Sequence, residues 1–233
     1  GTILMPVFAL FFPLEMAIAL TGVVHLLNNL FKMYLVGKEA NWRIVIKFGA
    51  PAVISALIGA WLLMSFSETT EWYVYSLGGK EFVITPIKVV VSFLMFGFAF
   101  LELMPLFKKL EFAENKLFIG GVISGFFGGL SGHQGALRSA FLIKYGLSKE
   151  SFIATGVMIS SVIDISRVSV YFTKYTSIGV EENVNFLLAA VLAAFAGALI
   201  GKKLLKKITT TFVQITVAVM IMLMAIAIGL GIL

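Results

Sequence analysis

The sequence predicts an all-α protein, a polytopic bundle of membrane helices built from two repeats of inverted topology. The first observation is composition: mean hydropathy is +1.02 and only 13% of residues are charged, against about 25% in ordinary soluble domains. The second is length, since several apolar runs reach the roughly 20 residues that a helix needs to cross about 30 Å of hydrocarbon. The third is an internal repeat. Each repeat is expected to hold three spans and a re-entrant broken-helix hairpin.

Six full spans are expected, and the charge of their loops orients them. Basic residues group near 38–47, 108–116 and 202–207, whereas the loops near 67–82 and 177–183 are acidic or nearly neutral. Cytoplasmic loops carry the excess of lysine and arginine, so the first group is expected on that side. This topology explains the net charge of +6 without a nucleic-acid partner. The spans are about 15–36, 43–66, 86–107, 149–173, 186–204 and 209–232.

Shorter apolar pieces at about 1–12, 116–131 and 135–146 need a different arrangement. The last two would be only about 24 and 18 Å long as helices, too short to span singly. Both begin or end beside lysines of the cytoplasmic side. Non-helical backbone at membrane depth is tolerated only where protein buries it or where it lines a cavity. A re-entrant hairpin is therefore predicted, with its tip in the glycine-rich stretch 128–139.

The segment 67–85 leaves two interpretations open. It alternates apolar and polar residues on either side of a Gly-Gly pair, which is typical of a short extracellular β-hairpin. Its aromatic residues are equally typical of the belt that forms at a membrane interface.

An internal repeat divides the chain into residues 1–107 and 108–233, which together form one integral membrane domain. Residues 21–23 and 155–157 share Thr-Gly-Val, and a small-residue pattern at 56–60 returns at 194–198. Three spans are an odd number, so the halves must run in opposite directions. Inverted repeats with broken helices are typical of secondary transporters with a midplane site. By this alignment 1–12 is the outgoing arm of a matching hairpin whose first arm is missing, and no signal peptide is expected.

Arg138, in the arm that leaves the predicted tip, is the first candidate for substrate binding. A charge at membrane depth is costly and normally faces a cavity or a partner. A planar guanidinium matches a sulfonate or a carboxylate bidentately. Ser131, His133 and Gln134 would add donors beside it. The alternatives for Arg138 are a position at the membrane interface or an ion pair with Asp164.

A polar stripe on the first full span supplies further candidates. Thr21, His25 and Asn28 follow helical spacing on one face, with Asn29 beside them. The stripe is expected to line the substrate pathway, or else to form hydrogen bonds between helices. Thr155, which aligns with Thr21 in the second repeat, joins the substrate-binding set.

Asp164 is a candidate proton carrier, in competition with His25 and His133. Asp164 and Arg167 are three residues apart on one helix and could instead neutralise each other. Histidine has an unperturbed pKa near 6.5, which suits coupling to a physiological proton gradient. The sequence leaves these three carriers undecided.

Three segments of the chain resemble the TauE/SafE family of anion permeases. They are GTILMPVFALFFPLEMAIALTGVVHLLNNLF at 1–31, NWR at 41–43 and SGHQGALRSAFLIKYGLSKESFIATGV at 131–157. The resemblance implies a permease or exporter for a small sulfur-containing anion such as sulfite, thiosulfate or an organosulfonate. It also implies a multi-pass protein of the inner (plasma) membrane. Alternating access is expected, with protons as a candidate coupling ion and a homodimer as a candidate assembly.

Two other functions share features with this sequence. An anion-selective channel can also use arginine and helix dipoles, and it remains the alternative. An intramembrane serine protease is disfavoured: Gly129-Leu130-Ser131-Gly132 resembles its nucleophile motif, but no histidine follows His133 to act as the base. The expectation is therefore a non-enzyme without cofactor or metal.

Overall fold

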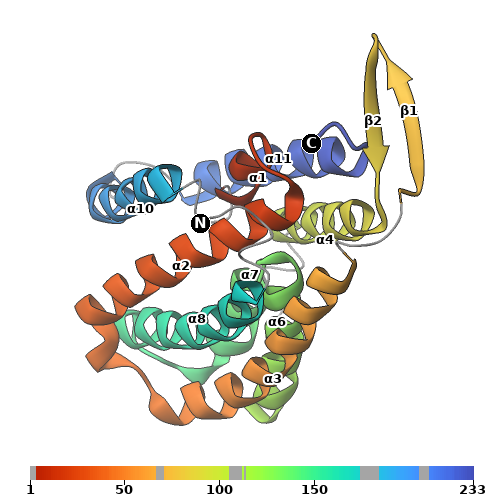
Figure 1. The fold of residues 1–233 in the computed structure, drawn as a ribbon. Helices are drawn as coiled ribbons and strands as arrows, with labels where there is room; N and C mark the ends of the chain where they lie inside the picture. The colour runs from red at the N-terminus through yellow and green to blue at the C-terminus, as the bar shows by residue number, and fades with distance from the viewer. Residues whose placement is uncertain (1–3, 67–70, 105–111, 113, 174–183, 205–209) are drawn as a thin grey trace.

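The protein is helical apart from one β-hairpin, as Figure 1 shows for a computed structural model that describes residues 4–66, 71–104, 112, 114–173, 184–204 and 210–233. Helices occur at all six expected spans, with ends that differ from the predicted ones by a few residues. The elements are α1 (Leu4–Ala9), α2 (Leu14–Val36), η1 (Gly37–Glu39), α3 (Trp42–Phe66), β1 (Tyr73–Leu77), β2 (Lys80–Ile84), α4 (Pro86–Leu103), η2 (Glu114–Lys116), α6 (Leu117–Ser131), α7 (Gly135–Leu142), η3 (Ile143–Tyr145), α8 (Lys149–Phe172), α10 (Val184–Leu204) and α11 (Thr210–Gly229).

Length and hydropathy confirm an all-α membrane protein. Four helices of the described chain are long and apolar enough to cross a bilayer: α2 continued through η1, then α3, α4 and α8. Shorter apolar stretches lie at Leu117–Ser131, Val184–Gly197 and Gln214–Gly229. The chain is therefore multi-pass.

The segment after α3 forms the β-hairpin that was one of its two interpretations. β1 and β2 pair antiparallel with Tyr75 opposite Phe82, and the turn residues Gly78 and Gly79 have φ of 61° and 79°. Glycine adopts these positive φ values without a steric penalty. The Tyr75 hydroxyl donates to the Leu230 carbonyl at 2.7 Å, so the hairpin is tied to the end of α11.

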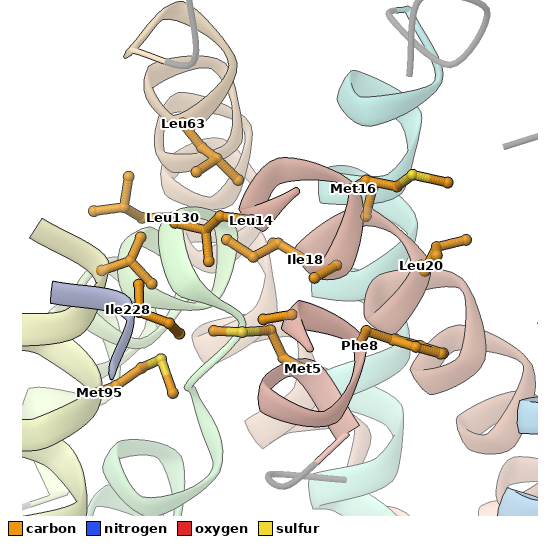
Figure 2. Packing of buried hydrophobic residues seen from close by; sticks show 14 of the residues in the cluster. Met5, Phe8, Leu14, Met16, Ile18, Leu20, Leu63, Met95, Leu130 and Ile228 are labelled. Carbon is orange, nitrogen blue, oxygen red and sulfur yellow. The ribbon is translucent and has the colours of Figure 1, made fainter. Parts of the chain in front are cut away.

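The helices pack in neighbouring pairs. Figure 1 shows α2 beside α8 and α4 beside α11, and contacts between these pairs are extensive. α3 packs against both α6 and α8. One apolar cluster contains buried side chains of α1, and Figure 2 shows that α2, α3, α4, α6 and α11 also contribute to it. A second cluster lies among α3, α6, α7 and α8.

Glycine allows α6 to lie directly on the backbone of α3. A Cβ added to any of three α6 glycines would overlap an α3 carbonyl oxygen: Gly121 on Phe48, Gly125 on Ala52 and Gly129 on Ala56. Residue numbers rise together along both helices, so the two run parallel. Small residues at such spacing let membrane helices approach closely where larger side chains would hold them apart. This packing fixes how far along α3 the end of α6 reaches.

Candidate functional site

The turn between α6 and α7 carries the first part of the site. Gly132 ends α6 in the left-handed conformation, φ 77°, and its N–H donates to the Gly128 carbonyl at 3.0 Å. The Ser131 hydroxyl donates to the Phe127 carbonyl at 3.0 Å, and His133 Nδ1 lies 2.9 Å from the Ser131 carbonyl. These local bonds hold the turn in shape. They also point the Ser131 proton away from His133, an arrangement that does not suit a nucleophilic serine.

Asp164 is the centre of a hydrogen-bond network between α2, α8 and this turn. Its carboxylate accepts from Asn29 Nδ2 at 2.8 Å and from Arg167 Nε at 2.9 Å. Arg167 Nη2 lies 2.8 Å from the same carboxylate, and both side chains are completely buried. A longer bond of 3.5 Å comes from Gln134 Nε2. A buried carboxylate with these donors is compensated in charge and in hydrogen bonds, as burial requires.

Arg138 has no such compensation. Its Nη1 donates to the Ser160 hydroxyl on α8, and no carboxylate of the described chain lies within ion-pair distance of it. Lys32 of α2 lies close enough to Arg138 and Asp164 to interact with both electrostatically. The cluster therefore holds two guanidinium groups and an ammonium group around one carboxylate. This excess of positive charge favours an anion.

A small cavity lies beside the network. Its volume is about 10 Å³, close to the least that holds one water molecule. Three lining residues carry a buried polar atom without a hydrogen-bond partner among the described residues: Thr21 Oγ1, His133 Nε2 and Arg167 Nη1. Met5 and Ile18, both labelled in Figure 2, form an apolar wall. The remaining lining residues are His25, Ser131 and Gly132.

Two glycines bring Arg167 to this cavity. A Cβ on Gly132 would stand 2.9 Å from Arg167 Nη1, tighter than ordinary contact. A Cβ on Gly22, beside Thr21, would stand 3.2 Å from Val168 and 3.7 Å from the guanidinium carbon of Arg167. The Thr-Gly-Val triplet of α2 and the turn after α6 thus leave room for one arginine between them.

Seven of the nine substrate-binding candidates fall into two groups in the structure. Thr21, His25, Ser131 and His133 line the cavity, and Asn29, Gln134 and Arg138 belong to the network around Asp164 and Ser160. Two candidates lie elsewhere, outside the cavity lining. Asn28 has a buried Oδ1 without a partner in the described chain, and Thr155 Oγ1 accepts from the Asn41 N–H at 2.9 Å beside the α2–α3 turn.

Arg167 lines the cavity although the sequence does not predict it there. The sequence presents it only as a neutralising partner of Asp164, and the two side chains do form that ion pair. Its third guanidinium nitrogen, Nη1, faces the turn after α6, which the spacing along α8 could not show. The signal that could have found it is that Ser160, Asp164, Arg167 and Tyr171 share one helical face.

The donor set suits an anion better than a cation. The described residues contain no group of three or more His, Asp or Glu side chains that could hold a metal ion. The atoms that lack partners at the cavity are a hydroxyl, an imidazole nitrogen and a guanidinium nitrogen. A guanidinium only donates hydrogen bonds, while a hydroxyl and an imidazole nitrogen can donate as well as accept.

Comparison with known families gives one match. The family model described as sulfite exporter TauE/SafE matches residues 1–228 of the 233. Searches of curated proteins and of solved structures found no match.

Proposed function

The chain belongs to the sulfite exporter TauE/SafE family, and on that basis we propose that it carries a small sulfur-containing anion across the inner membrane. Sulfite, thiosulfate and organosulfonates are the candidate substrates. Members of this family are transporters rather than enzymes, and the apolar helices agree with a membrane protein.

The observation that carries this proposal is the uncompensated positive charge buried between the helices. Arg167 pairs with Asp164, whereas Arg138 donates to the Ser160 hydroxyl and has no carboxylate of the described chain within ion-pair distance; a charge without a counter-ion inside a bilayer is unfavourable. An anion bound to the two guanidinium groups would remove that imbalance. Ser131, His133 and Thr21 would orient it through hydrogen bonds, and Gln134 and Asn29 would hold Asp164 in place.

Alternating access would deliver the anion to this position. The cavity of about 10 Å³ has room for roughly one water molecule, so an oxyanion requires it to expand. Tyr171 donates to the Gly129 carbonyl at 2.6 Å, and Arg167 reaches Gly132, so α8 holds the turn closed. In this proposal, motion of α8 relative to that turn would open the site.

The proposed architecture is two inverted repeats, 1–107 and 108–233, with re-entrant hairpins that meet at the site. Its support is that expected counterparts pack against each other: α2 against α8 and α4 against α11. α1 packs on α2 as α7 packs on α8. α6 has 15 residues, or about 22 Å, and its last turn lies against Ala56 and Ala60 of α3 rather than reaching beyond that helix.

We also propose that transport is coupled to protons, with Asp164 as the proton carrier. A substrate anion held by Arg167 would lie close to the Asp164 carboxylate, so protonation of Asp164 would remove the repulsion between the two negative charges and favour binding. His25 and His133 line the cavity and remain the other candidate carriers.

Flux in proteoliposomes tests the proposed function. Proteoliposomes loaded with sulfite should release it faster than loaded vesicles without protein. The rate of release should saturate at high sulfite concentration, and thiosulfate should compete with sulfite. Lys38→Gln, at an exposed site on η1, is the matched control for loss of one positive charge and should transport normally. Flux that does not saturate would indicate a channel, and equal leakage from both vesicle types would refute transport of sulfite.

A further inference from the structure

A second cavity lies outside the buried site, in the angle between α3 and α6. Its volume is about 670 Å³, and it shares no lining residue with the cavity at Arg167. Its walls are apolar side chains of both helices, among them Ile46, Ile54 and Ile58 of α3, and Phe118 and Val122 of α6. We refer to it as the α3–α6 groove.

Helical spacing produces the groove. Positions 46, 50, 54 and 58 repeat every four residues and so form one row along α3. Ala50 is small, which leaves a depression between Ile46 and Ile54. These isoleucines are 63% and 64% exposed, as is Phe118 at 64%. The row covers 12 residue steps (58 − 46), about 18 Å, which is a little more than half of the roughly 30 Å hydrocarbon thickness.

The polar groups of the groove gather at one end. Lys47 and Asn115 line it where α3 and α6 begin, and this end faces the cytoplasm in the expected topology. Ser55, deeper in the lining, donates its hydroxyl to the Pro51 carbonyl at 3.0 Å and so offers no free donor there. Among the lining residues that the structure describes, Lys47 is the one titratable residue. The groove therefore has an apolar part about as long as one leaflet of the bilayer and a cationic end.

From this arrangement we propose that the α3–α6 groove binds an anionic phospholipid of the cytoplasmic leaflet. One acyl chain lies between Ile54 and Phe118, and the phosphate is bound by Lys47 and Asn115. Basic positions between membrane helices on the cytoplasmic side are suited to anionic headgroups. A second copy of the chain fits less well, because a two-fold axis along the membrane normal would bring both Lys47 ammonium groups to the same depth.

Native mass spectrometry of the full chain in detergent tests the proposal. Phosphatidylglycerol and phosphatidylcholine with identical acyl chains serve as probes. Lys47→Gln should weaken phosphatidylglycerol binding about five-fold and leave phosphatidylcholine unchanged. Lys38→Gln removes an exposed cytoplasmic charge outside the groove and should change neither. An equal loss in both variants, or no loss in Lys47→Gln, would overturn the proposal.

A second variant tests the apolar part independently. Ala50→Trp fills the depression between the isoleucines and should lower binding of both lipids. A phosphatidylglycerol with a photoreactive acyl chain should label peptides that contain residues 46–58 and 117–122, and Ala50→Trp should abolish that labelling. Labelling confined to other helices would overturn the proposal. So would dissociation of a dimer by Ala50→Trp with lipid binding unchanged, since the groove would then be a contact between two copies.

Discussion

Arg167 contacts Asp164 through two of its three guanidinium nitrogens, at 2.9 Å and 2.8 Å, and places the third beside Gly132. The pair is completely buried one turn apart on α8. A guanidinium that is neutralised on one side and lacks a partner on the other can hold a second acceptor without leaving the first. This geometry leads to the first prediction.

Arg167→Gln should destabilise the protein, and Asp164→Asn added to it should restore most of the stability. Removing one partner of a buried ion pair costs about 3–5 kcal/mol because the other charge is left uncompensated. The double variant removes both charges of the pair, so neither partner is left uncompensated by the other, and thermal unfolding in detergent should show the recovery. Sulfite flux should remain absent in the double variant. A double variant that transports normally would show that Arg167 has a structural role alone.

Arg138→Gln should reduce transport with little loss of stability. Arg138 is half-buried and its described hydrogen bond is to Ser160, so the fold does not depend on a charge pair there. Loss of a hydrogen bond between a charged group and the substrate corresponds to about 2 kcal/mol, or roughly a thirty-fold rise in apparent KM. Ser160→Ala is the control for loss of the protein contact alone. An unchanged KM in Arg138→Gln would remove this residue from the site.

Asp164→Asn tests proton coupling. If the carboxylate carries the proton, the variant should still exchange sulfite across the membrane but should no longer move protons with it. A pH-sensitive dye inside the vesicles reports the protons, and labelled sulfite reports the exchange. Proton movement that persists in Asp164→Asn would transfer the role to His25 or His133.

Gly129→Ala should destabilise the protein by about 1–3 kcal/mol, the usual range for overpacking. Its Cβ would overlap the Ala56 carbonyl oxygen, a backbone atom that cannot rotate away. Gly97→Ala is the matched control, because no atom lies within 4 Å of the Cβ added to that α4 glycine. Thermal unfolding should separate the two variants. Equal stabilities would show that α6 and α3 are not packed backbone to backbone.

Tyr75→Phe should lower stability by about 0.5–1.5 kcal/mol through loss of its bond to the Leu230 carbonyl. The ring of Tyr73 stacks on the ring of Tyr75 in the same hairpin, and no hydrogen bond from the Tyr73 hydroxyl is seen in the described chain. Tyr73→Phe should therefore be neutral in the same unfolding measurement. Hydrogen exchange at β1 and β2 should rise in Tyr75→Phe alone.

The helices could be predicted from the sequence because a bilayer demands long apolar runs, and hydropathy reports these directly. The expected span 149–173 matches α8, Lys149–Phe172, almost to the residue. Helices also occur at the two shorter apolar pieces, α6 at Leu117–Ser131 and α7 at Gly135–Leu142. For these two short helices, hydropathy alone does not predict a membrane span, so the prediction also depended on glycine spacing and loop charge.

Side-chain partners could be predicted only in part. The periodicity of α8 correctly offered Asp164 as a partner for Arg167, because residues three apart on a helix are neighbours. It could not place Arg167 Nη1 beside Gly132, which lies 35 positions earlier (167 − 132) on another element. Thr155 shows the converse difficulty. It aligns with Thr21 in the repeat, yet its hydroxyl serves Asn41 at the α2–α3 turn.

The glycine face of α6 has a consequence for biogenesis. α6 is too short to partition into a bilayer as an independent span, and it ends in a turn with non-helical backbone. α3 leaves the ribosome earlier and presents the carbonyl ridge on which Gly121, Gly125 and Gly129 rest. α8, whose Tyr171 donates to the Gly129 carbonyl near the end of α6, emerges later. The order of translation therefore makes α3 available for packing before α6 is synthesised. α8 is synthesised afterwards and then fixes the end of α6.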